Sequence, residues 1–176
     1  MMTKKDFANS FLWKCKPGYM SIEVMGVILF VALMIGYVAW QLSATSSAAN
    51  LSMLQGSLTT MSMHIQKLYS GSNNYSGLNN AKAIKSGLVP QQLQRGDSIY
   101  TPWGGPITLA SGSTPDTFTV SVAGIKESDC ISMATYQLDV WANVTINGST
   151  LDKKSAVDSA VSLCSGASNT IVYTRR

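Results

Sequence analysis

A run of uncharged, mostly apolar residues near the N-terminus limits what this chain can form. Residues 24–40 contain no charged side chain, and as an α-helix they would reach roughly 25 Å, the short end of what crosses a bilayer. Apolar side chains fall on every side of that helix, so it needs lipid or other apolar helices all around it. The sequence therefore predicts a hydrophobic helix that lies in a membrane or in the core of an assembly.

The charges before this run predict its orientation. Four lysines precede it: Lys4, Lys5, Lys14 and Lys16. Lys and Arg close to a membrane span mark its cytoplasmic side, so we expect residues beyond about 42 to lie outside the cytoplasm. These features alone describe a signal-anchored extracytoplasmic domain. A cleaved secretory signal peptide fits less well, because no small-residue cleavage site comes before Trp40 and Glu23 interrupts the start of the apolar core.

Glu23 is the exception to the apolar pattern. It is the only acidic residue between Asp6 and Asp97, and a carboxylate at a membrane edge is costly unless it is paired. A basic leader ends at Gly18, Tyr19 follows, and Glu23 is the fifth residue counted from Tyr19. This combination, placed just before an apolar run, resembles the N-terminus of type IV prepilins.

The resemblance implies a processing step and an assembly role. A prepilin peptidase would cleave between Gly18 and Tyr19 on the cytoplasmic side and N-methylate the new amine of Tyr19. Glu23 would then pair with that amine, on the same or a neighbouring subunit, and set the axial register of the filament. The 18-residue leader and the tyrosine at the first mature position favour the type IVb class over type IVa.

The helix is expected to continue past the apolar run. Residues 43–70 contain one apolar stripe at spacings of three and four: Leu51, Leu54, Leu58, Met61, Ile65 and Leu68. Polar residues are expected on the other face: Ser52, Gln55, Ser57, Thr59, Ser62 and Gln66. We therefore predict one helix over about residues 19–70, ended by the turn-forming residues 71–77.

Shorter elements follow in the rest of the chain. The patterns predict a short helix over 78–86 and a loop that contains Arg95, Gly96 and Asp97. Trp103, Gly104 and Gly105 then lead into what we expect to be the first strand. Strands are predicted over 107–111, 117–123, 142–146 and 169–174, the last in the sheet interior, and helices over 127–141 and 155–163. The Trp-Gly-Gly segment before a strand again resembles type IVb pilins.

These elements predict an α+β fold, the type IV pilin fold, in which the second half of the long helix packs on a small antiparallel sheet. The expected domains are a cleaved leader over 1–18, a transmembrane or filament-core helix over 19–42 and an extracytoplasmic head over 43–176. The leader holds four lysines and one aspartate, so the mature chain keeps only +1 of the net charge of +4. Nucleic-acid binding is therefore not expected, since it requires clustered basic residues.

Three cysteines are present. Cys15 lies in the leader and would be discarded with it, whereas Cys130 and Cys164 lie in the exported part, where disulfides persist. From the residues alone, these two can form one disulfide or remain as two free thiols. The resemblance implies the disulfide, because type IV pilins close their exposed C-terminal region with one.

Residues for catalysis or metal binding do not gather in this sequence. His64 is the only histidine, so catalytic or metal-bound arrangements that need convergent ligands are not expected, and neither is a cofactor. His64 is interpreted as a solvated or inter-subunit polar contact. The tripeptide Arg95-Gly96-Asp97 is interpreted as a chance match to an adhesion motif, and Arg175 and Arg176 as a solvated tail.

The sequence is therefore interpreted as a structural subunit, not an enzyme, that polymerises into a type IVb pilus for conjugative attachment or adhesion. Within that class it most resembles the major pilin of plasmid-encoded conjugative thin pili. The implied partners are other copies of itself, the prepilin peptidase, an inner-membrane assembly platform with its ATPase and an outer-membrane secretin. The precursor would lie in the bacterial inner membrane and the product in the extracellular pilus. A type II secretion pseudopilin, a minor pilin and a signal-anchored binding domain are the alternatives.

Overall fold

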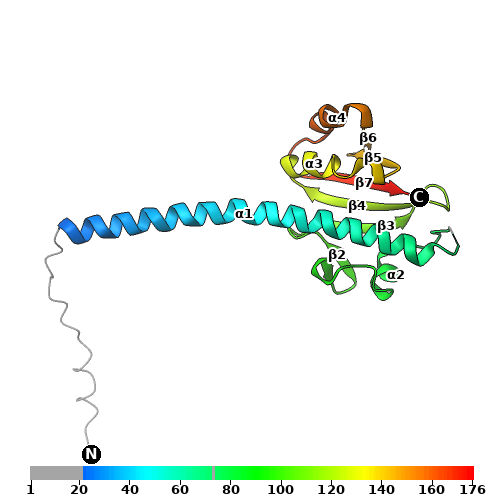
Figure 1. The fold of residues 1–176 in the computed structure, drawn as a ribbon, viewed down its shortest axis with the longest axis horizontal. Helices are drawn as coiled ribbons and strands as arrows, with labels where there is room; N and C mark the ends of the chain where they lie inside the picture. Colours follow the sequence, from blue (N-terminus) through cyan, green and yellow to red (C-terminus); the bar gives the residue numbers. More distant parts are fainter. Residues whose placement is uncertain (1–21, 73) are drawn as a thin grey trace, which may run out of the picture. The chain divides into compact units, whose positions relative to one another are not determined.

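The long N-terminal helix is present. The computed structural model describes residues 22–72 and 74–176, and helix α1 runs over Ile22–Tyr69 (Figure 1). Lys67 lies in its last turn, where a positive charge stabilises the carbonyl end of a helix. The chain divides into two compact units, Met1–Ala44 and Thr45–Arg176, and we call the second unit the head.

The apolar stripe of α1 is buried over most of its length. Leu54, Leu58, Met61 and Ile65 are at most 2% exposed, and Leu51 is half-buried. The prediction is wrong at Leu68, which is 54% exposed because it lies in the last turn of the helix, beside an open groove.

The predicted polar face of α1 is also partly wrong. Ser57 and Ser62 are buried, because the head covers a wider arc of the helix than one stripe. Burial of Ser62 is satisfied by hydrogen bonds: its Oγ donates to the Thr59 carbonyl at 2.9 Å and accepts from Arg175 Nη1 at 2.7 Å.

One seven-stranded sheet packs against this part of α1. Its strand order is β1-β2-β3-β4-β7-β5-β6, and every pairing is antiparallel. The strands are β1 (Gln94–Arg95), β2 (Ser98–Tyr100), β3 (Pro106–Ser111), β4 (Phe118–Ile125), β5 (Asn143–Ile146), β6 (Ser149–Thr150) and β7 (Asn169–Arg175). Leu109 pairs with Val120, and Val120 with Tyr173, so buried side chains of three strands form a row facing the helix stripe. The α+β fold is confirmed, with β7 in the sheet interior as predicted.

The first sheet edge differs from the prediction. The expected loop around Arg95 is a β1–β2 hairpin with Gly96 in the left-handed region at φ 60°. Trp103 and its glycines therefore lie between β2 and β3 and do not lead into the first strand. At Gly105 a Cβ atom would lie 2.0 Å from the Ala123 carbonyl oxygen, so only glycine allows this segment to lie so close to β4.

Helix α2 (Asn80–Lys85) covers the same edge and is followed by the 3-10 turn η1 (Gln91–Leu93). The Asn79 side chain caps its start by accepting from the Lys82 amide at 2.9 Å. Asn80 joins α2 to β3, because its side chain donates to the Ile107 carbonyl and accepts from the Leu109 amide. The predicted helix over 78–86 is thus present and is attached to the sheet by its side chains.

The other sheet edge carries the helices α3 (Glu127–Ala134) and α4 (Ala156–Leu163) and the 3-10 turns η2 (Leu138–Val140) and η3 (Lys153–Ser155). The single helix predicted over 127–141 is wrong beyond Ala134. Gln137 is in the left-handed region at φ 47°, which breaks the helix, and Trp141 turns into the core at 3% exposure. Asn147 and Gly148 form the predicted turn and connect β5 to the short strand β6, which the sequence patterns did not indicate.

Candidate functional site: apolar helix segment and disulfide-closed lobe

The first candidate surface is the N-terminal part of α1. All its large apolar side chains from Met25 to Tyr37 are between 48% and 73% exposed. Such a surface on every side of a helix is stable only when other apolar groups cover it. Among the residues that the structure describes, no helix combines the length and hydropathy that crossing a membrane requires.

The predicted processing residues cannot be compared with the structure. Gly18 and Tyr19 lie outside the described residues, as does Cys15. Glu23 falls in the first turn of α1, directly before the exposed apolar segment. The roles assigned to these residues therefore stay predictions.

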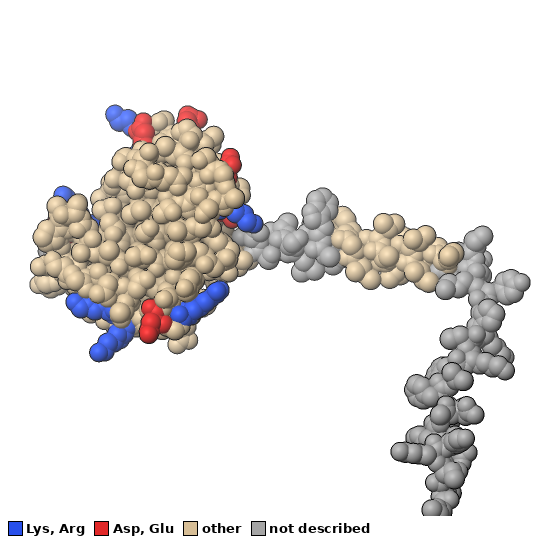
Figure 2. All heavy atoms as spheres, turned by 180° about the vertical axis from the view of Figure 1, so that it is seen from behind, with Lys and Arg blue, Asp and Glu red and all other residues tan. Residues whose placement is uncertain are grey.

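Charged side chains of the head separate toward opposite sheet edges. Residues 64–97, from the end of α1 through α2 to β2, carry four basic side chains and one acidic. Residues 127–164, from α3 to Cys164, carry five acidic side chains and two basic ones. We call these regions the basic edge and the acidic edge. Figure 2 shows mostly blue side chains along the lower side of the head and most of the red ones along the upper side.

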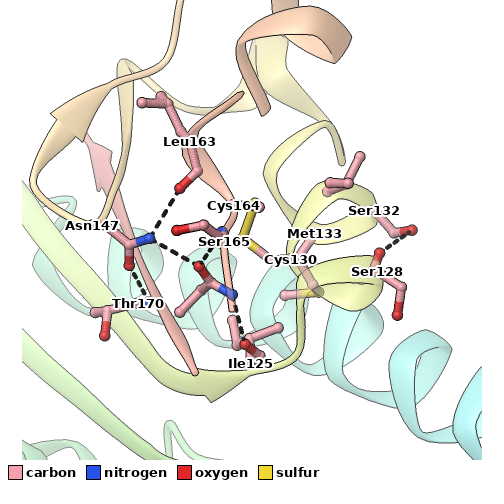
Figure 3. Close-up of a disulfide and its surroundings, with 12 residues drawn as sticks. Ile125, Ser128, Cys130, Ser132, Met133, Asn147, Leu163, Cys164, Ser165 and Thr170 are labelled. Carbon is pink, nitrogen blue, oxygen red and sulfur yellow. Dashed lines mark hydrogen bonds between the residues drawn. A yellow bond between two sulfur atoms is a disulfide. The ribbon is translucent and has the colours of Figure 1, made fainter. Parts of the chain in front are cut away.

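A disulfide closes the acidic edge. Cys130 of α3 and Cys164, directly after α4, are bonded, with their Cα atoms 6.0 Å apart (Figure 3). Both cysteines are buried, and the bond closes a loop with a sequence separation of 34 residues. The disulfide implied by the pilin resemblance is confirmed. A loop of this size lowers the entropy of the unfolded chain by an amount worth about 3–4 kcal/mol.

A buried asparagine connects this loop to the sheet. The Asn169 side chain, fully buried at the start of β7, donates to the Ile125 carbonyl at 3.1 Å. It accepts from the Ser165 amide and from Asn147 Nδ2, both at 2.9 Å (Figure 3). Asn147 in turn donates to the Leu163 carbonyl at 3.0 Å.

Together these bonds fix the end of α4, the β5–β6 turn and the end of β4 around one side chain. The sequence prediction had placed Asn169 in a strand without a role. A polar residue at the start of an otherwise apolar β-strand is the signal that could have identified it.

The interpretation of the two C-terminal arginines as a solvated tail is wrong. Arg175 is not part of a solvated tail: it belongs to β7 and its guanidinium lies over the Trp141 ring, 5.9 Å from the centroid. Its Nη1 also donates to Ser62 of α1, and partial burial lowers the pKa of the guanidinium. Tyr173, two residues earlier, stacks on Trp141 at 4.9 Å and donates its hydroxyl to the Met133 carbonyl.

Arg176 is also held in place. Its backbone carbonyl accepts a hydrogen bond from Gln66 of α1, and its Nε lies 3.4 Å from Asp116 Oδ2. These side chains are exposed, so the ion pair contributes little to stability. The C-terminus is nevertheless attached to both α1 and the β3–β4 turn.

His64 is exposed on α1, as expected, and lines an open groove of about 380 Å³ at the basic edge. The other lining residues are Lys67, Leu68, Ser86, Gly87 and Leu88. In the part of the chain that the structure describes, no group of three or more His, Cys, Asp or Glu side chains could hold a metal ion.

Comparison with known proteins gives a family match and matches among solved structures. The family model described as PilS N terminal matches residues 48–176, which is most of the chain. Among solved structures, the crystal structure of TcpA, a type IV pilin from Vibrio cholerae El Tor biotype, is similar with a TM-score of 0.52. The identity is 15%, and the match covers 73% of this chain and 99% of that chain. No curated protein gives a match to this chain.

The structural match is too distant in sequence to show more than the fold. It agrees with the observed long helix packed on an antiparallel sheet. The family match covers all but the first three residues of the head and includes both of its cysteines. The chain therefore belongs to the PilS N-terminal family and is a pilin, a structural subunit with the type IV pilin fold rather than an enzyme.

Proposed function

We propose that this pilin is made as a membrane precursor, is cut between Gly18 and Tyr19, and polymerises into a type IVb pilus through its N-terminal helix. The observation that carries the proposal is the exposed apolar segment of α1 between Met25 and Tyr37. In a filament, copies of this segment would bundle and cover one another. Before assembly, residues 19–42 would be held in the inner membrane.

Glu23 has a defined role in this proposal. Bundling would carry its carboxylate into a low-dielectric core, where an unpaired charge costs several kcal/mol. Cleavage creates an amine on Tyr19, four residues away, whereas the next Lys or Arg after it is Lys67. Pairing of Glu23 with that amine neutralises the carboxylate and fixes the axial register, since apolar packing alone lets helices slide. Uncut precursor lacks the amine and should not assemble.

The test compares Glu23→Ala with Ser21→Ala, a neutral change in the same part of the chain. Glu23→Ala should leave cleavage and membrane insertion intact but abolish or sharply reduce filaments, counted by electron microscopy at equal subunit levels. Ser21→Ala should form filaments normally. The Gly18→Val protein should keep its leader, as mass spectrometry would show, and should form no filaments. Normal pili from Glu23→Ala would instead favour a signal-anchored binding domain.

The 18-residue leader and Tyr19 support the type IVb class, and N-methylation of Tyr19 is part of the proposal. The Cys130–Cys164 disulfide favours a pilus subunit over a type II secretion pseudopilin, which usually lacks one. The proposed partners are copies of this chain, the prepilin peptidase, the inner-membrane platform with its ATPase and the outer-membrane secretin. The finished pilus would be extracellular.

Conjugative attachment is the proposed use of the pilus, with surface adhesion as the alternative. Deletion of this gene should lower plasmid transfer in liquid mating and leave growth unchanged, and the native gene should restore transfer. Unchanged transfer together with weaker binding to recipient or host surfaces would assign the pilus to adhesion.

A further inference from the structure

The turn between β5 and β6 contains a dipeptide that can modify itself. Asn147 is followed by Gly148, and this is the only Asn-Gly pair in the sequence. Because glycine has no side chain, the Gly148 amide nitrogen can approach the carboxamide carbon of Asn147 without steric hindrance. Both residues are exposed, so water reaches them. The pair therefore has the chemistry for spontaneous deamidation of the asparagine.

This reaction has two steps and needs only water. The Gly148 nitrogen bonds to Cγ of Asn147, the Cγ–Nδ2 bond breaks, and the proton of the attacking amide leaves with the released ammonia. Water then opens the succinimide ring at either carbonyl and gives aspartate or isoaspartate, with no oxidation or reduction. The first step requires the Asn147 carboxamide to turn toward the Gly148 nitrogen.

Three hydrogen bonds fix the Asn147 carboxamide to partners outside the turn. Its Nδ2 donates to the Leu163 carbonyl at 3.0 Å and to Asn169 Oδ1 at 2.9 Å. Its Oδ1 accepts from the Thr170 amide at 3.0 Å (Figure 3). Leu163 is the last residue of α4, and Asn169 and Thr170 begin β7. The side chain is thus held by hydrogen bonds rather than by burial.

We propose that Asn147 is a latent deamidation site, protected while the disulfide-closed lobe, residues 130–164, is folded onto the sheet and converted to aspartate or isoaspartate once that lobe opens. Deamidation should be roughly 100-fold slower in the folded protein than in the unfolded chain, because three hydrogen bonds must break before the ring can close. The disulfide contributes to the protection, since Cys164 is bonded to Cys130 and directly follows Leu163. This inference does not depend on assembly into a pilus.

The product does not fit the native arrangement. One oxygen of a carboxylate at position 147 could still accept from the Thr170 amide, but the other would face the Leu163 carbonyl and Asn169 Oδ1, which are both acceptors. Asn169 cannot rotate its amide to compensate, because its Nδ2 donates to the Ile125 carbonyl. An unpaired carboxylate among acceptors destabilises the closed lobe. A single opening can therefore leave a permanent chemical change that disfavours closing again.

Peptide mapping by mass spectrometry tests the protection in the full chain, purified in detergent and kept at mildly alkaline pH. Asn147 should deamidate about 100-fold more slowly in the folded protein than in the same protein unfolded in guanidinium chloride. Equal rates would overturn the proposal. In the unfolded chain, Gly148→Ala should slow the reaction because its methyl group hinders the attack, and an unchanged rate would overturn the proposed route.

Two asparagine variants test the role of the network. In the folded protein, Asn169→Ala removes one of the three bonds and should raise the Asn147 rate at least about five-fold. The matched change Asn143→Ala, on neighbouring β5, should leave the rate unchanged. Equal rates in the two variants would overturn the role of the network. If circular dichroism shows that Asn169→Ala is unfolded, the comparison of folded and unfolded native chain decides alone.

Asn147→Asp tests the consequence of the modification. At neutral pH the variant should unfold at a lower urea concentration than the native chain. Below about pH 4 this difference should shrink, because the protonated acid can again donate a hydrogen bond. An unchanged midpoint at neutral pH would overturn the claim that the product disfavours closing, and a difference that is independent of pH would overturn its electrostatic cause.

Discussion

Replacement of Asn169 by alanine tests whether the disulfide-closed lobe, residues 130–164, depends on one buried side chain for its stability. The change removes a long hydrogen bond of 3.4 Å to the Gly166 carbonyl and three shorter ones: to the Ile125 carbonyl, from the Ser165 amide and from Asn147 Nδ2. At about 1 kcal/mol for each of the three shorter bonds, the loss is about 3 kcal/mol. The Ile125 carbonyl and the Ser165 amide would also lose their partner, which makes this figure a lower bound.

Urea unfolding of the purified head, residues 45–176, measures this loss. With a slope of about 1.5 kcal/mol/M, the midpoint should fall by about 2 M. The matched control is Asn143→Ala on neighbouring strand β5, where the described residues provide no side-chain hydrogen bond to the half-buried asparagine. The control should change stability by less than about 0.5 kcal/mol. If Asn169→Ala unfolds at the same urea concentration as the control, the network does not stabilise the lobe.

Three further predictions concern the disulfide, the burial of the helix stripe and a buried tyrosine. Cys130→Ser should lower the free energy of unfolding by about 3–4 kcal/mol and reduce pilus yield. Mass spectrometry of native filaments should find no free thiol at Cys130 or Cys164. Ready alkylation of these cysteines in the native protein would contradict the prediction. Leu58→Asp should unfold the head because Leu58 is buried. Leu68→Asp should leave the melting temperature of the head unchanged because Leu68 is exposed. Equal melting temperatures for the two variants would mean that the stripe lies in solvent. Burial raises the pKa of Tyr173 above its ordinary 10.0, so the unfolded state loses that proton first. Stability should therefore fall above pH 10, and Tyr173→Phe should weaken that fall, as followed by circular dichroism; an unchanged alkaline profile would contradict it.

The long helix and the central strands could be predicted because their patterns are local and repeated. Leu54, Leu58, Met61 and Ile65 follow the helical spacing closely, and β3, β4 and β7 alternate as half-buried strands do. The same spacing predicted burial of Leu68, but burial depends on whether another element packs there. Next to the final turn of α1 there is an open groove instead.

The missed elements are short or depend on distant contacts. Strands β1 and β6 have two residues each, too few for alternation to be visible, and β2 has three. The end of α3 at Ala134 is set by the left-handed Gln137 and the burial of Trp141, and neither is visible in local spacing. Arg175 is ordered by Ser62 and Trp141, residues far away in the sequence.

The candidate site could be predicted in part. The apolar run and the two cysteines after it, Cys130 and Cys164, can be identified from the sequence, and the disulfide agrees with the resemblance to type IV pilins. The edge charges were not identified, because they form only when the sheet order places β1–β2 and β5–β6 at opposite ends. The role of Asn169 likewise depends on Ile125, Asn147 and Ser165 coming together in the fold.

The central position of β7 has a consequence for how the head is made. Strand β7 is last along the chain, yet it lies between β4 and β5. A nascent chain that stops before residue 169 has two separate ladders, β1–β4 and β5–β6, each with an unpaired edge where β7 belongs. The sheet can close only once residues 169–175 are available to pair with both β4 and β5. Folding itself thus distinguishes complete heads from truncated ones, because only a chain that includes β7 can join the two ladders.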